Sequence, residues 1–152
     1  KIAIKKFKLK IVYWVITKKN PFKNKTFYSL EQRVKYAKKI TQAQKKIKTI
    51  HLDNIINSSR IIDVINYFIK KKKIQNIYFI IGSDNLMQFH KWKSWKKIVK
   101  IVKLIVFSRK GYDRKGMKST VVKNFKNKII FLKNKPISIS STQLKNRAKL
   151  NT

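Results

Sequence analysis

The chain has 152 residues, of which 43% are hydrophobic and 12% aromatic, a composition that predicts one folded domain and argues against disorder. It contains no cysteine, which excludes a disulfide framework and a thiolate metal site and fits a reducing cytoplasm. Lysine interrupts the apolar runs before they reach the length of a signal-peptide core or a membrane span, so we expect neither a signal peptide nor a transmembrane helix.

The formal net charge of +35 comes almost entirely from lysine, with arginine only at positions 33, 60, 109, 114 and 147. Specific recognition of phosphates and bases favours the bidentate fork of arginine, and the lysines are spread over the whole chain. We therefore expect loose, salt-sensitive binding to polyanions as a side effect of composition, and no dedicated nucleic-acid site.

Residues 1–10 have the apolar spacing of a short helix, with Ala3, Ile4 and Phe7 on its buried face. Residues 11–17, rich in β-branched and aromatic side chains, predict a buried strand. The strand leads into a loop that contains Asn20.

A capping box, Ser29 with Gln32, predicts a helix from residue 30 to about residue 43. A short strand is expected over residues 49–52, and its His51 is expected to be packed or exposed, because no carboxylate partner is placed to orient it. Ser58 and Ser59 then predict the cap of a helix over residues 60–71.

Residues 77–81 form a continuous apolar run, which predicts a strand buried on both faces of a parallel sheet. Gly82 ends this run, and Asp84 follows at the carboxyl end of the strand, where open α/β sheets bind ligands. With Trp92 and Trp95 nearby, a carboxylate and a flat indole suit a nucleotide. The alternative is an ordinary strand, turn and helix with the tryptophans in the core.

A helix is expected over residues 95–100 and a strand over residues 103–107, followed by Arg109, while residues 112–127 are expected to be loop. A last strand is expected over residues 128–132. Ser140 and Gln143 have the spacing of a capping box, so a helix is expected to start there with hydroxyl groups around its N-terminus. Such a helix end either binds phosphate or is a plain cap.

Three motifs carry a resemblance to a known family: GSDNLMQFHKWKSW over residues 82–95, Asn20-Pro21-Phe22-Lys23, and Ile139-Ser140-Ser141-Thr142. In this order and spacing, along nearly the whole chain, they resemble the bacterial nicotinate-nucleotide adenylyltransferases of the nucleotidyltransferase superfamily. The resemblance implies a single Rossmann-like α/β domain over residues 1–152, with a mostly parallel sheet and helices on both faces.

The family transfers AMP from ATP to nicotinate mononucleotide, with Mg²⁺ assisting, and forms no covalent enzyme intermediate. By resemblance, the ATP-binding residues are Gly82, Asp84, Arg109, Ser140, Ser141, Thr142 and Lys145, and the mononucleotide-binding residues are Asn20, Lys23 and Trp92. Lys145 stands where the family has arginine, which implies weaker or less oriented phosphate binding.

One departure concerns the H-x-G-H signature that the family carries after its first strand, because this motif does not occur in the sequence. We therefore expect that the first strand and its loop are missing and that the chain by itself is inactive or barely active. Two alternatives are a sister nucleotidyltransferase of the pantetheine-phosphate type and a non-enzymatic basic protein that binds nucleic acid.

Overall fold

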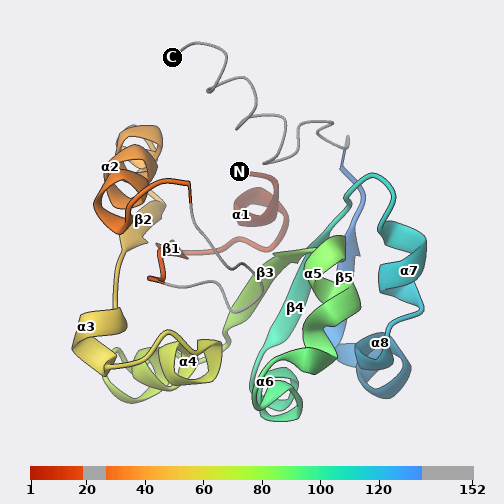
Figure 1. Cartoon of the computed structure of the whole chain (residues 1–152). Helices are drawn as coiled ribbons and strands as arrows, with labels where there is room; N and C mark the ends of the chain where they lie inside the picture. The colour runs from red at the N-terminus through yellow and green to blue at the C-terminus, as the bar shows by residue number, and fades with distance from the viewer. Residues whose placement is uncertain (19–26, 135–152) are drawn as a thin grey trace. The chain divides into compact units, whose positions relative to one another are not determined.

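The computed structural model describes residues 1–18 and 27–134 of the chain (Figure 1). The chain divides into two compact units, Lys1–Lys71 and Lys72–Thr152, which are described separately below. The expectation of a single domain stays a prediction.

The first unit contains a two-stranded sheet with its helices. In chain order its elements are α1 (Ile2–Lys6), β1 (Val12–Val15), α2 (Leu30–Thr41), β2 (Ile47–Ile50), α3 (Asp53–Ile56) and α4 (Ile61–Lys70). β1 and β2 are parallel and level, with Val12 opposite Ile47 and Val15 opposite Ile50. Both strands therefore end at the same edge of this sheet.

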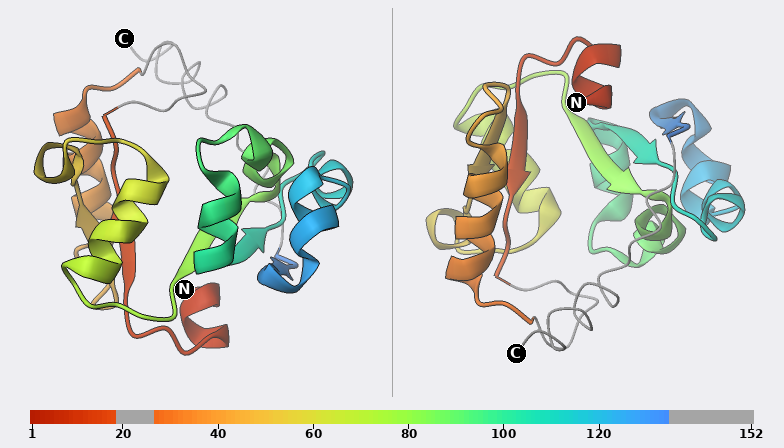
Figure 2. Two further views of the ribbon diagram at one scale, coloured as in Figure 1. Left: turned by 90° about the horizontal axis from the view of Figure 1, so that it is seen from below. Right: turned by 90° about the horizontal axis from the view of Figure 1, so that it is seen from above.

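The capping box predicted for α2 is confirmed. The Gln32 amide donates to Ser29 Oγ at 3.2 Å, and the Ser29 amide donates to Gln32 Oε1 at 2.9 Å. The helix buries Ala37 and Thr41, and it lies alongside β2, as the views of Figure 2 show. It ends at Thr41, two residues before the predicted end.

The apolar stripe predicted for α4 is confirmed, because Val64, Ile65 and Phe68 are buried. The Phe68 ring lies 4.7 Å from the Tyr13 ring of β1, between ring centroids, and this contact holds α4 against the sheet. The predicted cap was displaced by one residue, since Arg60 is the N-cap.

The second unit contains a three-stranded parallel sheet with the order β3-β4-β5 (Figure 1). Its elements are β3 (Tyr78–Gly82), α5 (Ser83–Gln88), the 3-10 turn η1 (Phe89–Lys91), α6 (Trp95–Ile101), β4 (Lys103–Phe107), α7 (Asp113–Met117), α8 (Thr120–Phe125), the 3-10 turn η2 (Lys126–Lys128) and β5 (Ile129–Leu132). The prediction of parallel sheets flanked by helices is confirmed.

β4 forms the core of this unit. Leu104, Ile105 and Val106 are fully buried, and α5 and α6 pack against the strand. The expectation that residues 77–81 form the strand buried on both faces was wrong, because β3 lies at an edge of the described sheet and keeps most of its residues only half-buried.

The expectation of a loop over residues 112–127 was also wrong, since α7 and α8 occupy this stretch. The two helices have only five and six residues, so their apolar periodicity is weak in the sequence, and tertiary contacts fix them. Val121 of α8 is fully buried, and Gly116 of α7 lies against Ser83 of α5. Among the described helices, none is long and apolar enough to cross a membrane.

Candidate functional site

Two predicted site residues meet at the carboxyl ends of β3 and β4. Gly82 and Phe107 are partners in the parallel ladder, so the two strands end level with each other. Asp84 lies in the first turn of α5, and Arg109 follows β4. Arg109 Nη1 donates to Asp84 Oδ2 at 2.7 Å, with the side chains 43% and 24% exposed. The pair is thus a partly exposed carboxylate and guanidinium at the edge where open α/β sheets generally bind ligands.

The Asp84 carboxylate lies against Gly82. A Cβ atom at position 82 would collide with Asp84 Oδ1 and would also touch the side chain of Arg109. Asp84 Oδ1 is buried and accepts no hydrogen bond from the described residues. Because glycine has no side chain, position 82 leaves the space that the Asp84 carboxylate occupies.

A second carboxylate, which sequence reasoning missed, fixes the backbone beneath this pair. The Arg109 amide donates to Asp113 Oδ1 at 2.9 Å and to Ser83 Oγ at 3.1 Å. The Ser108 hydroxyl donates to Asp113 Oδ2. Hydrogen bonds from the Ser108 and Ser83 hydroxyls, together with the Arg109 amide, hold the pKa of the Asp113 carboxyl below its ordinary value.

Trp92 follows the η1 turn and packs within the second unit. Its ring stacks on the buried Phe89 ring at 4.9 Å between centroids, and it meets the Phe79 ring edge-on at 6.0 Å. This packing agrees with the alternative interpretation of a core tryptophan. A role for Trp92 in stacking on a ligand stays a prediction.

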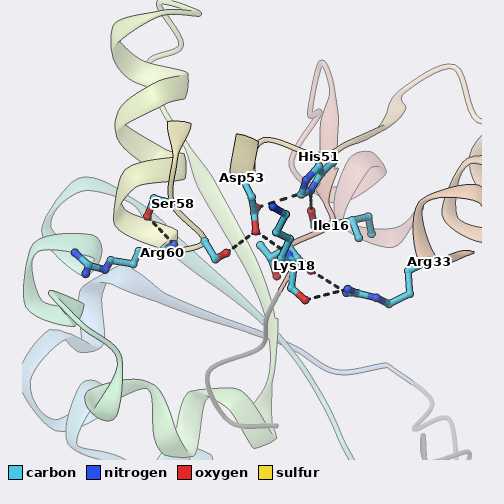
Figure 3. A network of polar contacts seen from close by, with 9 residues as sticks. Ile16, Lys18, Arg33, His51, Asp53, Ser58 and Arg60 are labelled. Atoms are coloured by element: carbon cyan, nitrogen blue, oxygen red, sulfur yellow. Dashed lines mark hydrogen bonds and ion pairs between the residues drawn. The ribbon is translucent and has the colours of Figure 1, made fainter. Parts of the chain in front are cut away.

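In the first unit, Arg33 of α2 holds the backbone that leaves β1 (Figure 3). Its Nη1 donates to the Thr17 carbonyl at 2.8 Å and its Nη2 to the Lys18 carbonyl at 3.0 Å. The fork of the guanidinium thus bridges two consecutive carbonyl groups, a geometry that lysine does not offer.

His51 and Asp53 hold the same segment from the side of β2 (Figure 3). His51 Nδ1 lies 2.7 Å from the Ile16 carbonyl, and the Lys18 amide donates to Asp53 Oδ2 at 2.7 Å. The Asp53 side chain is 4% exposed and also accepts a hydrogen bond from the Ser59 hydroxyl. His51 is packed, as expected, and a carboxylate that sequence reasoning did not place stands near it, because its Nδ1 lies 3.8 Å from Asp53 Oδ1.

The expected site residues Asn20, Lys23, Ser140, Ser141, Thr142 and Lys145 lie outside the described residues. Within residues 1–18 and 27–134, no group of three or more His, Cys, Asp or Glu side chains could hold a metal ion. The described part of the site therefore consists of a hydrogen-bonded ion pair with its supporting network, without a metal cage of side chains.

The chain resembles several known proteins. The model of the cytidylyltransferase-like family matches residues 1–147. A probable nicotinate-nucleotide adenylyltransferase from Pelagibacter ubique is 45% identical over 95% of this chain and 81% of its own length. Another from Clostridium tetani is 34% identical over 88% of this chain and 64% of its own length.

Among solved structures, the nicotinic acid mononucleotide adenylyltransferase of Plasmodium falciparum, complexed with NaAD, superimposes with a TM-score of 0.69. The match covers 91% of this chain and 69% of that protein at 16% identity, and it confirms the predicted nucleotidyltransferase fold. The family match and the bacterial relatives go further than the fold. The chain belongs to the cytidylyltransferase-like family and, within it, to the nicotinate-nucleotide adenylyltransferases.

Proposed function

We propose that the chain binds ATP beside Asp84 and Arg109, in the arrangement with which its family transfers the AMP group to nicotinate mononucleotide. An oxygen of the mononucleotide phosphate attacks the α-phosphorus of ATP, and the bond from that phosphorus to the bridging oxygen breaks. Pyrophosphate leaves with the electron pair, and nicotinate adenine dinucleotide is formed. The names of the bacterial relatives support this reaction, and the Asp84–Arg109 pair is the observation that supports its location.

Asp84 is proposed to accept hydrogen bonds from the ribose hydroxyls of ATP, and Arg109 to border the adenine ring. The carboxylate suits this role because it is an acceptor fixed at the end of a buried sheet and is 24% exposed. Arg109 holds one of its oxygens at 2.7 Å, so a ribose hydroxyl has to share or replace that bond. Gly82 leaves room for either arrangement.

The remaining roles are proposed from the matching motifs. Trp92 would stack on the nicotinate ring with Asn20 and Lys23 around the mononucleotide, and the phosphates of ATP would be bound by Ser140, Ser141, Thr142 and Lys145. Catalysis by such a site rests on positioning and on charge stabilisation. We expect Mg²⁺ to enter with the phosphates of ATP, as is usual for this ion, and the described side chains offer it no separate cage.

The proposed location is the cytoplasm, because a sequence without cysteine fits a reducing compartment. Loose binding to polyanions is expected beside the specific substrates because of the charge of +35.

The test is calorimetric titration of ATP into the wild type and into Asp84→Asn. We expect at least tenfold weaker ATP binding by the variant, because hydrogen bonds to a charged group are worth about 1.5–3 kcal/mol. The direction of the change in ATP affinity distinguishes two effects. Removing a negative charge strengthens the general attraction of this basic chain for ATP, so weaker binding by Asp84→Asn reports the lost ribose contact. The titration measures binding and not turnover, because the H-x-G-H motif does not occur in the sequence and little activity is expected without it.

The matched control is Asp63→Asn, which removes an equal charge from the first unit, where Asp63 accepts a hydrogen bond from Ser58 at 2.6 Å. Its ATP affinity should equal or slightly exceed that of the wild type. Equal ATP affinities of Asp84→Asn and the wild type would contradict the proposed site.

The substrate is tested by titrating nicotinate mononucleotide and pantetheine phosphate in turn. Saturable binding of the first and not the second is expected. Binding that follows only charge, with a steep fall in salt for both ligands, would favour a basic polyanion-binding protein instead.

A further inference from the structure

We propose that Arg33, His51 and Asp53 are positioning residues that hold the carboxyl end of β1 in the conformation required for binding the mononucleotide. We call these three residues the β1 clamp. The inference rests on the proposed function and adds to it residues that touch no substrate themselves.

The β1 clamp binds four backbone groups just beyond the end of the strand. β1 ends at Val15, and the Ile16 amide still donates to the Ile50 carbonyl at 2.8 Å. Beyond this point, side chains bind the backbone of residues 16 to 18. His51 binds the carbonyl of residue 16, Arg33 the carbonyls of residues 17 and 18, and Asp53 the amide of residue 18.

Three elements supply these side chains, which makes the arrangement rigid. Arg33 comes from α2, His51 from the residue after β2, and Asp53 from the start of α3. Figure 3 shows them converging on the strand end from opposite sides. Rigidity of this kind is what a binding loop needs from its base, because supporting contacts keep the groups that touch the ligand in place.

The energetics argue that stability alone does not explain the β1 clamp. Asp53 is a 4% exposed carboxylate, and burying such a group is costly unless hydrogen bonds compensate. Buried polar atoms of all three side chains, Arg33 Nε, His51 Nε2 and Asp53 Oδ1, have no hydrogen-bond partner among the described residues. These buried atoms without a partner add a cost beyond what pairing the strand end requires, so we infer that the exact path of the backbone is what these residues maintain.

The position of the β1 clamp, at the carboxyl ends of β1 and β2, supports its role in binding the mononucleotide. The parallel strands β1 and β2 end at this edge, which is the ligand-binding edge of α/β sheets. In the sequence, Asn20 and Lys23, the proposed mononucleotide residues, follow the clamped Lys18, although they lie outside the described residues. The proposed ATP residues Asp84 and Arg109 belong to the second unit. Loss of the β1 clamp should therefore affect one substrate and not the other.

The experiment compares Arg33→Lys and Arg33→Ala with the wild type in titrations of nicotinate mononucleotide and ATP. Lysine keeps the charge but lacks the fork that bridges two carbonyls. We expect both variants to bind the mononucleotide about tenfold more weakly and ATP unchanged, because misplacement by a fraction of an ångström is costly in a preorganised site. Hydrogen exchange of the Lys18 amide should become faster in both.

Arg60→Lys and Arg60→Ala are the matched controls. Arg60 is an exposed arginine of the same unit, and its side chain points away from the clamped segment in Figure 3. Both controls should bind the two ligands like the wild type. If Arg33→Lys restored wild-type mononucleotide binding while Arg33→Ala did not, charge alone would be at work and the positioning role would be overturned.

A second pair of variants keeps the test decisive if the Arg33 variants fold poorly. His51→Asn places an amide donor near the position of Nδ1 and should retain mononucleotide affinity, whereas His51→Leu should lose it about tenfold. Equal affinity of the two would overturn the inference, as would equal losses for ATP and the mononucleotide. A wild type that binds neither ligand would overturn the proposed function itself, which is a different result from unaffected variants.

Discussion

Three of the five acidic residues stand just beyond the ends of parallel strands. Asp53 follows β2, Asp84 follows β3, and Asp113 follows β4. Each carboxylate accepts hydrogen bonds at the edge where α/β sheets bind ligands. In a chain with 40 basic residues, acidic residues are rare enough that their positions carry information.

Asp113→Asn should destabilise the fold at neutral pH and not at acidic pH. The pKa of Asp113 is lowered in the folded chain, chiefly by the Ser108 hydroxyl, so its ionised form stabilises the native state above the ordinary pKa of about 3.9. This contribution is lost as the pH falls through the lowered value. We expect the difference in unfolding free energy between wild type and variant, measured by urea denaturation, to shrink below about pH 4.

Comparison with Ser119→Ala, a hydroxyl variant in the same unit without a titratable partner, controls for general acid effects. Its difference from the wild type should be constant over the same range. A difference for Asp113→Asn that grew towards acid pH would contradict the assignment.

The sequence predicted that Asp84 and Arg109 follow the ends of strands, and it failed at His51 and Asp53 for a physical reason. Asp84 and Arg109 follow strongly apolar strands, so their positions at strand ends were evident. The strand around His51 was expected over residues 49–52, but it ends at Ile50. That shift moves His51 out of the strand to its end and brings it beside Asp53, a partnership that sequence spacing did not reveal.

At the scale of elements, the position of a strand within its sheet decides how much it contributes to stability. β3 and β4 have similar apolar compositions, and from sequence alone residues 77–81 were expected to form a strand buried on both faces. β4 lies between two strands and buries its central residues completely. The order of strands depends on contacts between distant segments, which local periodicity does not encode.

Leu104→Ala should therefore destabilise the fold by about 2–5 kcal/mol, the usual range for a fully buried leucine. Ile40→Ala, at a position in α2 that is 68% exposed, should change the unfolding free energy by less than about 0.5 kcal/mol. Urea denaturation of both variants measures the two changes. Similar costs at the two positions would show that the burial of β4 does not determine the stability.

At the scale of the whole molecule, the net charge of +35 is the dominant electrostatic property. Like charges spread over a compact chain repel one another and favour the expanded, unfolded state. Salt screens this repulsion, because the Debye length falls from about 30 Å at 0.01 M to about 3 Å at 1 M ionic strength.

We expect the unfolding free energy to rise with sodium chloride over this range. Thermal denaturation at several salt concentrations measures the effect, and sodium sulfate at equal ionic strength separates screening from specific anion binding. A steady fall in melting temperature with chloride would mean that attractive ion pairs outweigh the repulsion.

The division into two compact units has an optical consequence. The sequence has three tryptophans: Trp14 belongs to Lys1–Lys71, and Trp92 and Trp95 belong to Lys72–Thr152. Trp14 is 42% exposed, whereas Trp92 is stacked on Phe89, so their emission spectra report different surroundings. With Trp14 replaced by phenylalanine the fluorescence follows only the second unit, and with Trp92 and Trp95 replaced it follows only the first. The chain thus contains intrinsic fluorophores with which the loss of structure in each unit can be timed separately.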